Sequence, residues 1–198
     1  MTRLSLAIVA AALLGACQPA NAPAPQASAS PAAAPSAAPV QASGCAAHAV
    51  RSWEAKPGAI FTIEADTLGP DCAHAVAVMV IRKADGDPVF QWTLATQFII
   101  GLAEAKDAPA MAAGVKDFVN DAETATTGEL PEWKAGQDSP MRGEFAFMPA
   151  EGVDRAAYAD LRKQKFPMFC FAQGLESMNC LALREDMFES VGFQLLPG

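Results

Sequence analysis

The chain has 198 residues, a formal net charge of −8 and hydrophobic side chains at 52% of its positions. The negative charge argues against a nucleic acid partner, because neutralising phosphates requires clustered Lys and Arg. It also argues against an electrostatic attachment to anionic lipid. The length that remains after the N-terminal segments suits one domain with a core of its own.

The first segment, residues 1–16, has the parts of a secretory signal peptide. Arg3 supplies the positive charge, residues 4–14 are apolar, and Gly15 and Ala16 are small residues before a cleavage point. The apolar run is too short to cross a bilayer, which takes roughly 20 residues. We therefore expect residues 1–16 to be a leader that is removed.

The residues around the cleavage point are Leu14-Gly15-Ala16-Cys17. They resemble the lipobox of bacterial lipoproteins, in which the cysteine is lipidated and becomes the new N-terminus. The resemblance implies that Cys17 carries several acyl chains, palmitate among them, and two or more chains make membrane anchoring stable. The next residue is Gln18 and not aspartate. In enteric lipoproteins, a residue other than aspartate at this position goes with sorting to the outer membrane, facing the periplasm. The alternative is a secreted protein in which this cysteine occurs by chance.

The segment 17–43 continues from the lipidated cysteine as a spacer. Residues 18–43 are almost entirely Ala, Pro, Ser and Gln and contain no charge. Such a composition has too little apolar bulk to repay the entropy of folding, and its prolines favour extended conformations. We expect a tether that holds a single domain, residues 44–198, away from the membrane.

Four cysteines lie in that domain: Cys45, Cys72, Cys170 and Cys180. An even number in an oxidising compartment predicts two disulfides, for which three connectivities are possible. The pairing Cys45–Cys72 and Cys170–Cys180 is favoured, because a hairpin centred on residues 174–176 would place the last two cysteines opposite each other.

The first half of the domain predicts an antiparallel meander. Residues 61–65 alternate apolar and polar side chains, as in a half-buried strand. Residues 75–82 are apolar on both faces, which predicts a central strand covered on both sides. Asp85-Gly86 is a hairpin signal, and the alternation resumes over residues 90–94.

The second half changes period. The predicted elements in chain order are a helix beginning near Asp107, a polar surface loop over 124–142, a strand at 145–147, a second helix capped by Asp154, and strands over 166–173, 179–184 and 191–196. Helices and strands do not alternate, which argues against a doubly wound parallel sheet. The sequence predicts an α+β fold: one antiparallel β-sheet with about two helices packed on one side, and two disulfides.

The domain also resembles uncharacterised envelope lipoproteins of proteobacteria. The resemblance lies in residues 61–65, in Gly69-Pro70-Asp71-Cys72 and in Val80-Ile81-Arg82. It implies an envelope location and carries no activity with it.

The best-defined candidate for a chemically active site is a metal site. Cys45-x-x-His48 and Cys72-x-His74 could together offer four ligands to zinc or copper(I). However, the one-residue gap before His74 is tight, and cysteines outside the cytoplasm should oxidise. We therefore expect a structural disulfide beside two incidental histidines, with no metal and no cofactor. A metal-binding protein or hydrolase that uses His48 and His74 is the alternative.

A tryptophan offers the clearest candidate for binding. Trp133 lies in the polar loop and is the least easily explained of the three tryptophans as core packing, and loops often carry binding function. Motifs of serine hydrolases, zinc proteases and nucleotide-binding enzymes are absent from the sequence. We therefore predict a non-enzymatic envelope module that binds a protein, glycan or small ligand, with inhibition of an envelope enzyme as one variant.

Overall fold

The computed structural model describes residues 44–197. The predicted leader 1–16 and the predicted lipidated tether 17–43 lie outside the described residues. Within 44–197 there are ten strands and two α-helices. The strands are β1 Ala47–Lys56, β2 Ala59–Leu68, β3 Val76–Lys83, β4 Pro88–Ala95, β5 Glu123–Thr126, β6 Met141–Arg142, β7 Phe145–Pro149, β8 Pro167–Ala172, β9 Ser177–Arg184 and β10 Met187–Leu195. The helices are α1 Ala108–Asn120 and α2 Arg155–Gln164.

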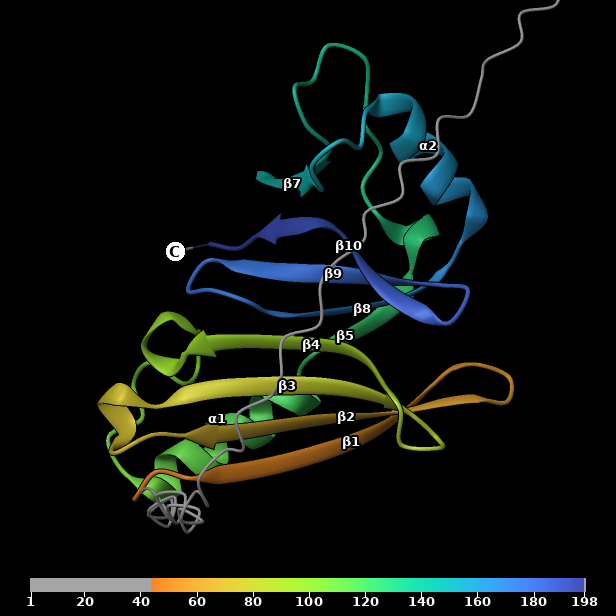
Figure 1. Cartoon of the computed structure of the whole chain (residues 1–198). Coiled ribbons are helices and arrows are strands. Elements are labelled where there is room, and N and C mark those ends of the chain that lie inside the picture. Colours follow the sequence, from red (N-terminus) through yellow and green to blue (C-terminus); the bar gives the residue numbers. More distant parts are fainter. Residues whose placement is uncertain (1–43, 198) are drawn as a thin grey trace, which may run out of the picture. The chain divides into compact units, whose positions relative to one another are not determined.

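The strands form two antiparallel sheets, where the sequence predicted one (Figure 1). Sheet A has the order β1-β2-β3-β4, and sheet B has the order β5-β8-β9-β10-β7-β6. The predicted meander is therefore confirmed as β2, β3 and β4, with β1 as an additional edge strand. The α+β class and the antiparallel pairing are confirmed as well.

Within residues 44–197, sheet A is covered on one face only. Phe61, Ile63 and Ala65 of β2 are buried on the inner face, whereas Val78 and Val80 of β3 remain half-buried on the other. The prediction that β3 is covered on both sides was therefore wrong. β-Branched side chains favour a central strand because they fit its pleated surface, and they do so whether or not a second layer covers them.

Sheet B contributes to two separate cores, one on each of its faces. One face packs against the inner face of sheet A, where Trp53 of β1 lies 5.8 Å from Phe169 and 5.7 Å from Phe188, measured between ring centroids. The other face packs against α2 through Tyr158 and Leu161. Burial of aromatic and aliphatic side chains on both faces makes sheet B the structural centre of the domain.

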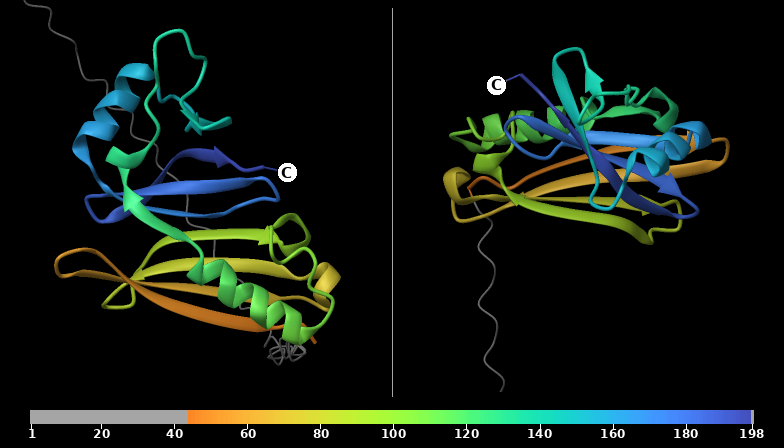
Figure 2. Two further views of the ribbon diagram at one scale, coloured as in Figure 1. Left: turned by 180° about the vertical axis from the view of Figure 1, so that it is seen from behind. Right: turned by 90° about the horizontal axis from the view of Figure 1, so that it is seen from above.

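Helix α1 lies across the inner face of sheet A, as Figure 2 shows from behind. Its predicted start near Asp107 is confirmed, and the Asp107 side chain caps the helix by accepting a hydrogen bond of 2.9 Å from the amide of Ala110. At the other end, Arg51 of β1 donates to the carbonyl oxygens of Asn120 and Ala122, at 2.9 and 3.1 Å. A guanidinium at this end of a helix complements the partial negative charge of the exposed carbonyls.

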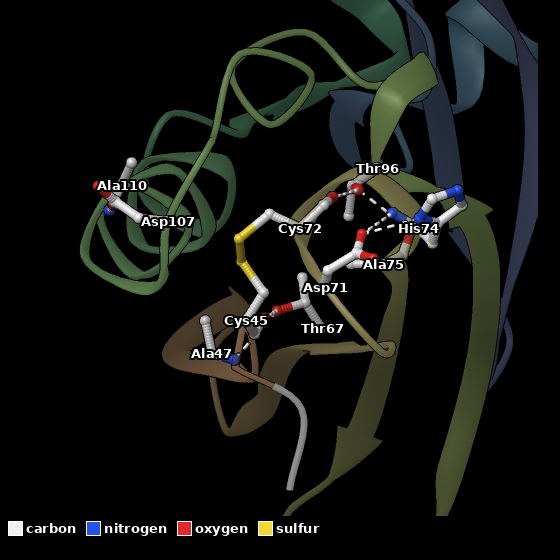
Figure 3. The surroundings of a disulfide bond; sticks show 10 residues. All are labelled: Cys45, Ala47, Thr67, Asp71, Cys72, His74, Ala75, Thr96, Asp107 and Ala110. Carbon is white, nitrogen blue, oxygen red and sulfur yellow. Dashed lines mark hydrogen bonds and ion pairs between the residues drawn. A yellow bond between two sulfur atoms is a disulfide. The ribbon is translucent and has the colours of Figure 1, made fainter.

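Both favoured disulfides are confirmed. Cys170 and Cys180 are directly opposite in the pairing of β8 with β9, as the predicted hairpin required. Cys45–Cys72 joins the segment just before β1 to the short 3₁₀ turn before β3 (Figure 3). Two buried threonines fix the backbone beside this bridge, because Thr67 Oγ1 donates to Cys45 O and Thr96 Oγ1 donates to Cys72 O, at 2.9 and 3.3 Å.

Candidate functional site

The two histidines are each paired with an aspartate on the surface. His48 Nδ1 lies 2.9 Å from Asp66 Oδ1, and His74 Nδ1 lies 2.8 Å from Asp71 Oδ1. The hydrogen bond with His74 holds the pKa of the Asp71 carboxyl below its usual range. Among residues 44–197, no group of three or more His, Cys, Asp or Glu side chains is arranged to hold a metal ion. Use of these histidines for metal binding or hydrolysis stays a hypothesis.

Trp133 is half-buried and is held by its surroundings. Its ring lies 5.7 Å from the ring of Tyr158, edge to face, and the guanidinium of Arg155 lies 4.7 Å from its centroid. Its indole Nε1 donates to Gln137 O at 3.0 Å. These contacts give Trp133 a role in the structure of its loop, and its predicted role in binding stays a prediction.

Arg155 and Tyr158 of α2 fasten the same loop. Arg155 donates to the carbonyl oxygens of Trp133, Lys134 and Gln137, at 3.0, 2.7 and 2.7 Å. The Tyr158 hydroxyl donates to Pro131 O at 2.8 Å, and burial raises the pKa of its phenol. The predicted surface loop is therefore held at its base by α2.

A groove made of two adjoining hollows lies at sheet B, and neither the two histidines nor Trp133 lines it. The first hollow has a volume of about 340 Å³ and is lined by the end of α1 and by parts of β5, β8 and β9. The second has a volume of about 230 Å³ and lies on the face of sheet B that carries Cys170–Cys180. Glu123, Met178 and Leu196 line both hollows. We call this combined site the sheet B groove.

Carboxylates surround the first hollow. Asp117, Asp121 and Glu123 line it together with the apolar side chains of Phe118 and Met178, and no Lys or Arg is among its lining residues. In the described part of the chain, neither Asp117 nor Asp121 forms an ion pair. Because the C-terminal end of α1 adds a partial negative charge, this end of the groove favours a cation.

Arg51 supplies a positive charge close to the end of α1. Its guanidinium is partly buried, which lowers its pKa, and it contacts the carbonyl oxygens at the end of α1 as described above. It also lies 5.6 Å from the ring centroid of Phe169. Arg51 therefore offsets part of the charge from the core side, while the groove itself is lined by the carboxylates.

An ion pair crosses the second hollow. Arg142 Nη1 of β6 lies 3.6 Å from Glu123 Oε2 of β5, although β5 and β6 are the two outermost strands of sheet B. Sheet B therefore curves until its opposite edges approach each other. Both side chains are about half exposed, so the pair itself contributes no more than roughly 1 kcal/mol.

Gln194 of β10 lines the second hollow and carries an unpaired polar atom. Its side chain is 5% exposed, and its amide nitrogen donates to Ala146 O and Leu195 O, at 3.3 and 3.0 Å. Carbonyl oxygens only accept, so the nitrogen must face them and Oε1 must face away from them. Among the described residues Oε1 has no hydrogen-bond partner. A buried acceptor without a partner costs about 1–3 kcal/mol.

One local feature of the sequence indicated this groove weakly. Asp117 and Asp121 are four residues apart, which places two carboxylates on one side of α1 near its end. Nothing local indicated that Glu123 and Arg142 would meet, because their contact depends on the curvature of a six-stranded sheet. The isolation of Gln194 Oε1 likewise depends on the pairing of β10 with β7.

No protein family, curated protein or solved structure matches this chain. The two α-helices of residues 44–197 are too short or too polar to span a membrane.

Proposed function

We propose that this chain is a lipid-anchored, non-enzymatic binding module of the bacterial envelope, whose ligand site is the sheet B groove. The lipobox-like residues 14–17 and the uncharged spacer that follows support an anchor at Cys17, with outer-membrane sorting from Gln18. The two disulfides support an oxidising compartment.

The groove carries the proposal because it combines three properties of a ligand site. It is concave, it has an apolar lining that includes Phe118 and Met178, and it places a few polar groups around that lining. Among these, the buried and unpaired Oε1 of Gln194 is the single most informative observation. A buried acceptor of this kind calls for a partner, and a bound ligand would supply one.

The anchor is tested by fractionating cells that express the full chain. We expect the protein in the membrane fraction, and we expect Cys17→Ser to abolish that association because no acyl chain can then be attached. Gln18→Asp serves as the matched variant, which should keep the protein in membranes and move it from the outer to the inner membrane. Full membrane retention of Cys17→Ser would contradict the anchor.

The binding site is tested by photo-crosslinking in living cells. A photoreactive amino acid replaces Leu196 in the groove or Ile60 on the open face of sheet A, which is 49% exposed. We expect a discrete adduct from position 196 and none from position 60. Equal adducts at both positions, or none at position 196, would count against the groove as the ligand site.

A further inference from the structure

We infer that the ligand of the sheet B groove is a basic, amphipathic segment of a partner protein. This inference rests on the function proposed above and adds the chemistry of the ligand. It combines three independent properties of the groove: its charge, its unpaired acceptor and its exposed apolar rim.

The charge of the groove selects a cation. Asp117 and Asp121 form no ion pair within residues 44–197, and Glu123 has only the 3.6 Å contact with Arg142. An ammonium or guanidinium group entering the first hollow would meet all three carboxylates, and it would compete with Arg142 for Glu123. An anionic ligand would face the same carboxylates unfavourably.

The unpaired acceptor selects an N–H donor. Gln194 Oε1 can only accept a hydrogen bond, and the side chain is 5% exposed at the second hollow. Lysine and arginine side chains carry three and five N–H donors, so a segment with several basic residues could place one against the carboxylates of the first hollow and another at Gln194 in the second. Neither a carboxylate nor an aliphatic group could do so.

The rim of the groove selects a protein segment over a free amine. Ile100 and Leu195 line the two hollows and are 45% and 39% exposed, although both are large apolar side chains. A small polyamine has no side chains to cover them. A peptide that alternates basic and apolar residues would place the former against the carboxylates and the latter against this rim.

The test uses the mature lipidated chain in a non-ionic detergent and measures the fluorescence anisotropy of labelled probe peptides. The probe is a short peptide that alternates Lys and Leu. Three competitors accompany it: the same peptide with Glu for Lys, the same peptide with Ser for Leu, and spermine. We expect the Lys/Leu peptide to bind best and its affinity to fall as salt rises, because exposed charges are screened.

The decisive variant is Asp117→Asn combined with Asp121→Asn, two exposed positions whose substitution should leave the fold intact. We expect it to weaken binding of the Lys/Leu peptide about tenfold, from the loss of two charge contacts. The matched control is Glu132→Gln with Asp138→Asn, which removes two exposed carboxylates outside the groove and should change affinity by less than about twofold. Gln194→Leu, checked for folding by circular dichroism, should also weaken binding.

Each of the following outcomes would overturn the inference. Equal loss in the groove variant and in the control would mean that the whole acidic surface attracts the peptide. Preference for the Glu peptide would reverse the charge assignment, and spermine binding as well as the peptide would make a free polyamine the ligand. If crosslinking at position 196 persists in any of these cases, the proposed function stands and only the ligand chemistry fails.

Discussion

Single residues in this domain often serve several neighbours at once. Thr127 illustrates this economy, because its buried hydroxyl donates to Leu161 O at 2.7 Å and accepts from the amide of Phe166 at 3.0 Å. Thr67 does the same between Cys45 and Ala47. Satisfying buried backbone groups with side chains lets irregular segments lie inside the structure without the cost of unpaired donors and acceptors.

Tyr158 gives a prediction for alkaline pH. Burial raises the pKa of its phenol, so the folded state keeps the proton at a pH where the unfolded chain loses it, near pH ~10. This contribution to the free energy of unfolding is complete below that pH and is lost as pH rises above it. Urea unfolding between about pH 8 and 11 should therefore show falling stability.

The variant Tyr158→Phe isolates this effect from the lysines that titrate in the same range. It should lower stability at neutral pH by about 1 kcal/mol, from the lost hydrogen bond to Pro131, and reduce the alkaline slope. Tyr158 is the only tyrosine in the chain, so phenolate absorbance reports on it directly. Ionisation of the folded protein near pH ~10 would show that the phenol is not shielded.

Local signals explain which residues were predicted correctly. Asp154 caps α2 as predicted, and α1 begins beside Asp107 as predicted, because capping needs only the aspartate and amides three residues away. The surroundings of Trp133 escaped prediction for the opposite reason. Its main partners, Arg155 and Tyr158, are more than twenty residues along the chain, so a residue in a polar stretch was expected to be more exposed than it is.

At the scale of elements, strand β1 was missed although its side chains alternate. Its inward positions are mostly small, with Ala47, Ala49 and Ala55 beside Arg51 and Trp53, and alanine is a weak strand former. What stabilises β1 is its pairing with β2 and the packing of Trp53 against sheet B. Such contacts are non-local, so residues 47–56 alone could not indicate them.

The loop on α2 gives a prediction at the same scale. Trp133→Ala should lower the free energy of unfolding by about 2 kcal/mol, less than a fully buried tryptophan would cost, because the indole is half-buried. Hydrogen exchange should increase over residues 131–137, where Arg155 and the indole hold the backbone. Lys134→Ala is the exposed control and should change little. Unchanged stability in Trp133→Ala would mean that the ring is free to serve as a binding platform.

At the scale of the whole molecule, the division into two sheets is the largest difference from the sequence prediction. Strand periodicity indicates which face of each strand is apolar, but it does not indicate how many sheets the strands form. Here the inner face of sheet A packs on one face of sheet B, and aromatic pairs such as Phe61–Phe188, 5.1 Å apart, join them. The sheet B groove arises from this arrangement, which is why its residues were not predicted together.

The two disulfides allow a test of loop closure across the domain. Cys45–Cys72 spans 27 residues and Cys170–Cys180 spans 10. From chain entropy, replacing both cysteines of the first pair with alanine should cost about 3.5 kcal/mol, and of the second about 2.7 kcal/mol. Denaturant unfolding of the two double variants checks the order. A larger loss for the shorter loop would show that packing around Cys170 and Cys180 outweighs loop entropy.

The ion pair between Glu123 and Arg142 also affects whether copies of this domain can associate through their sheet edges at high concentration. An open sheet edge invites a neighbouring chain to add a strand, which is a common start of aggregation. The outermost strands of sheet B have only four residues in β5 and two in β6, and the ion pair draws them together. Sheet B therefore offers a neighbour no long edge to extend, so strand addition between crowded copies would be limited to β1 and β4, the edges of sheet A.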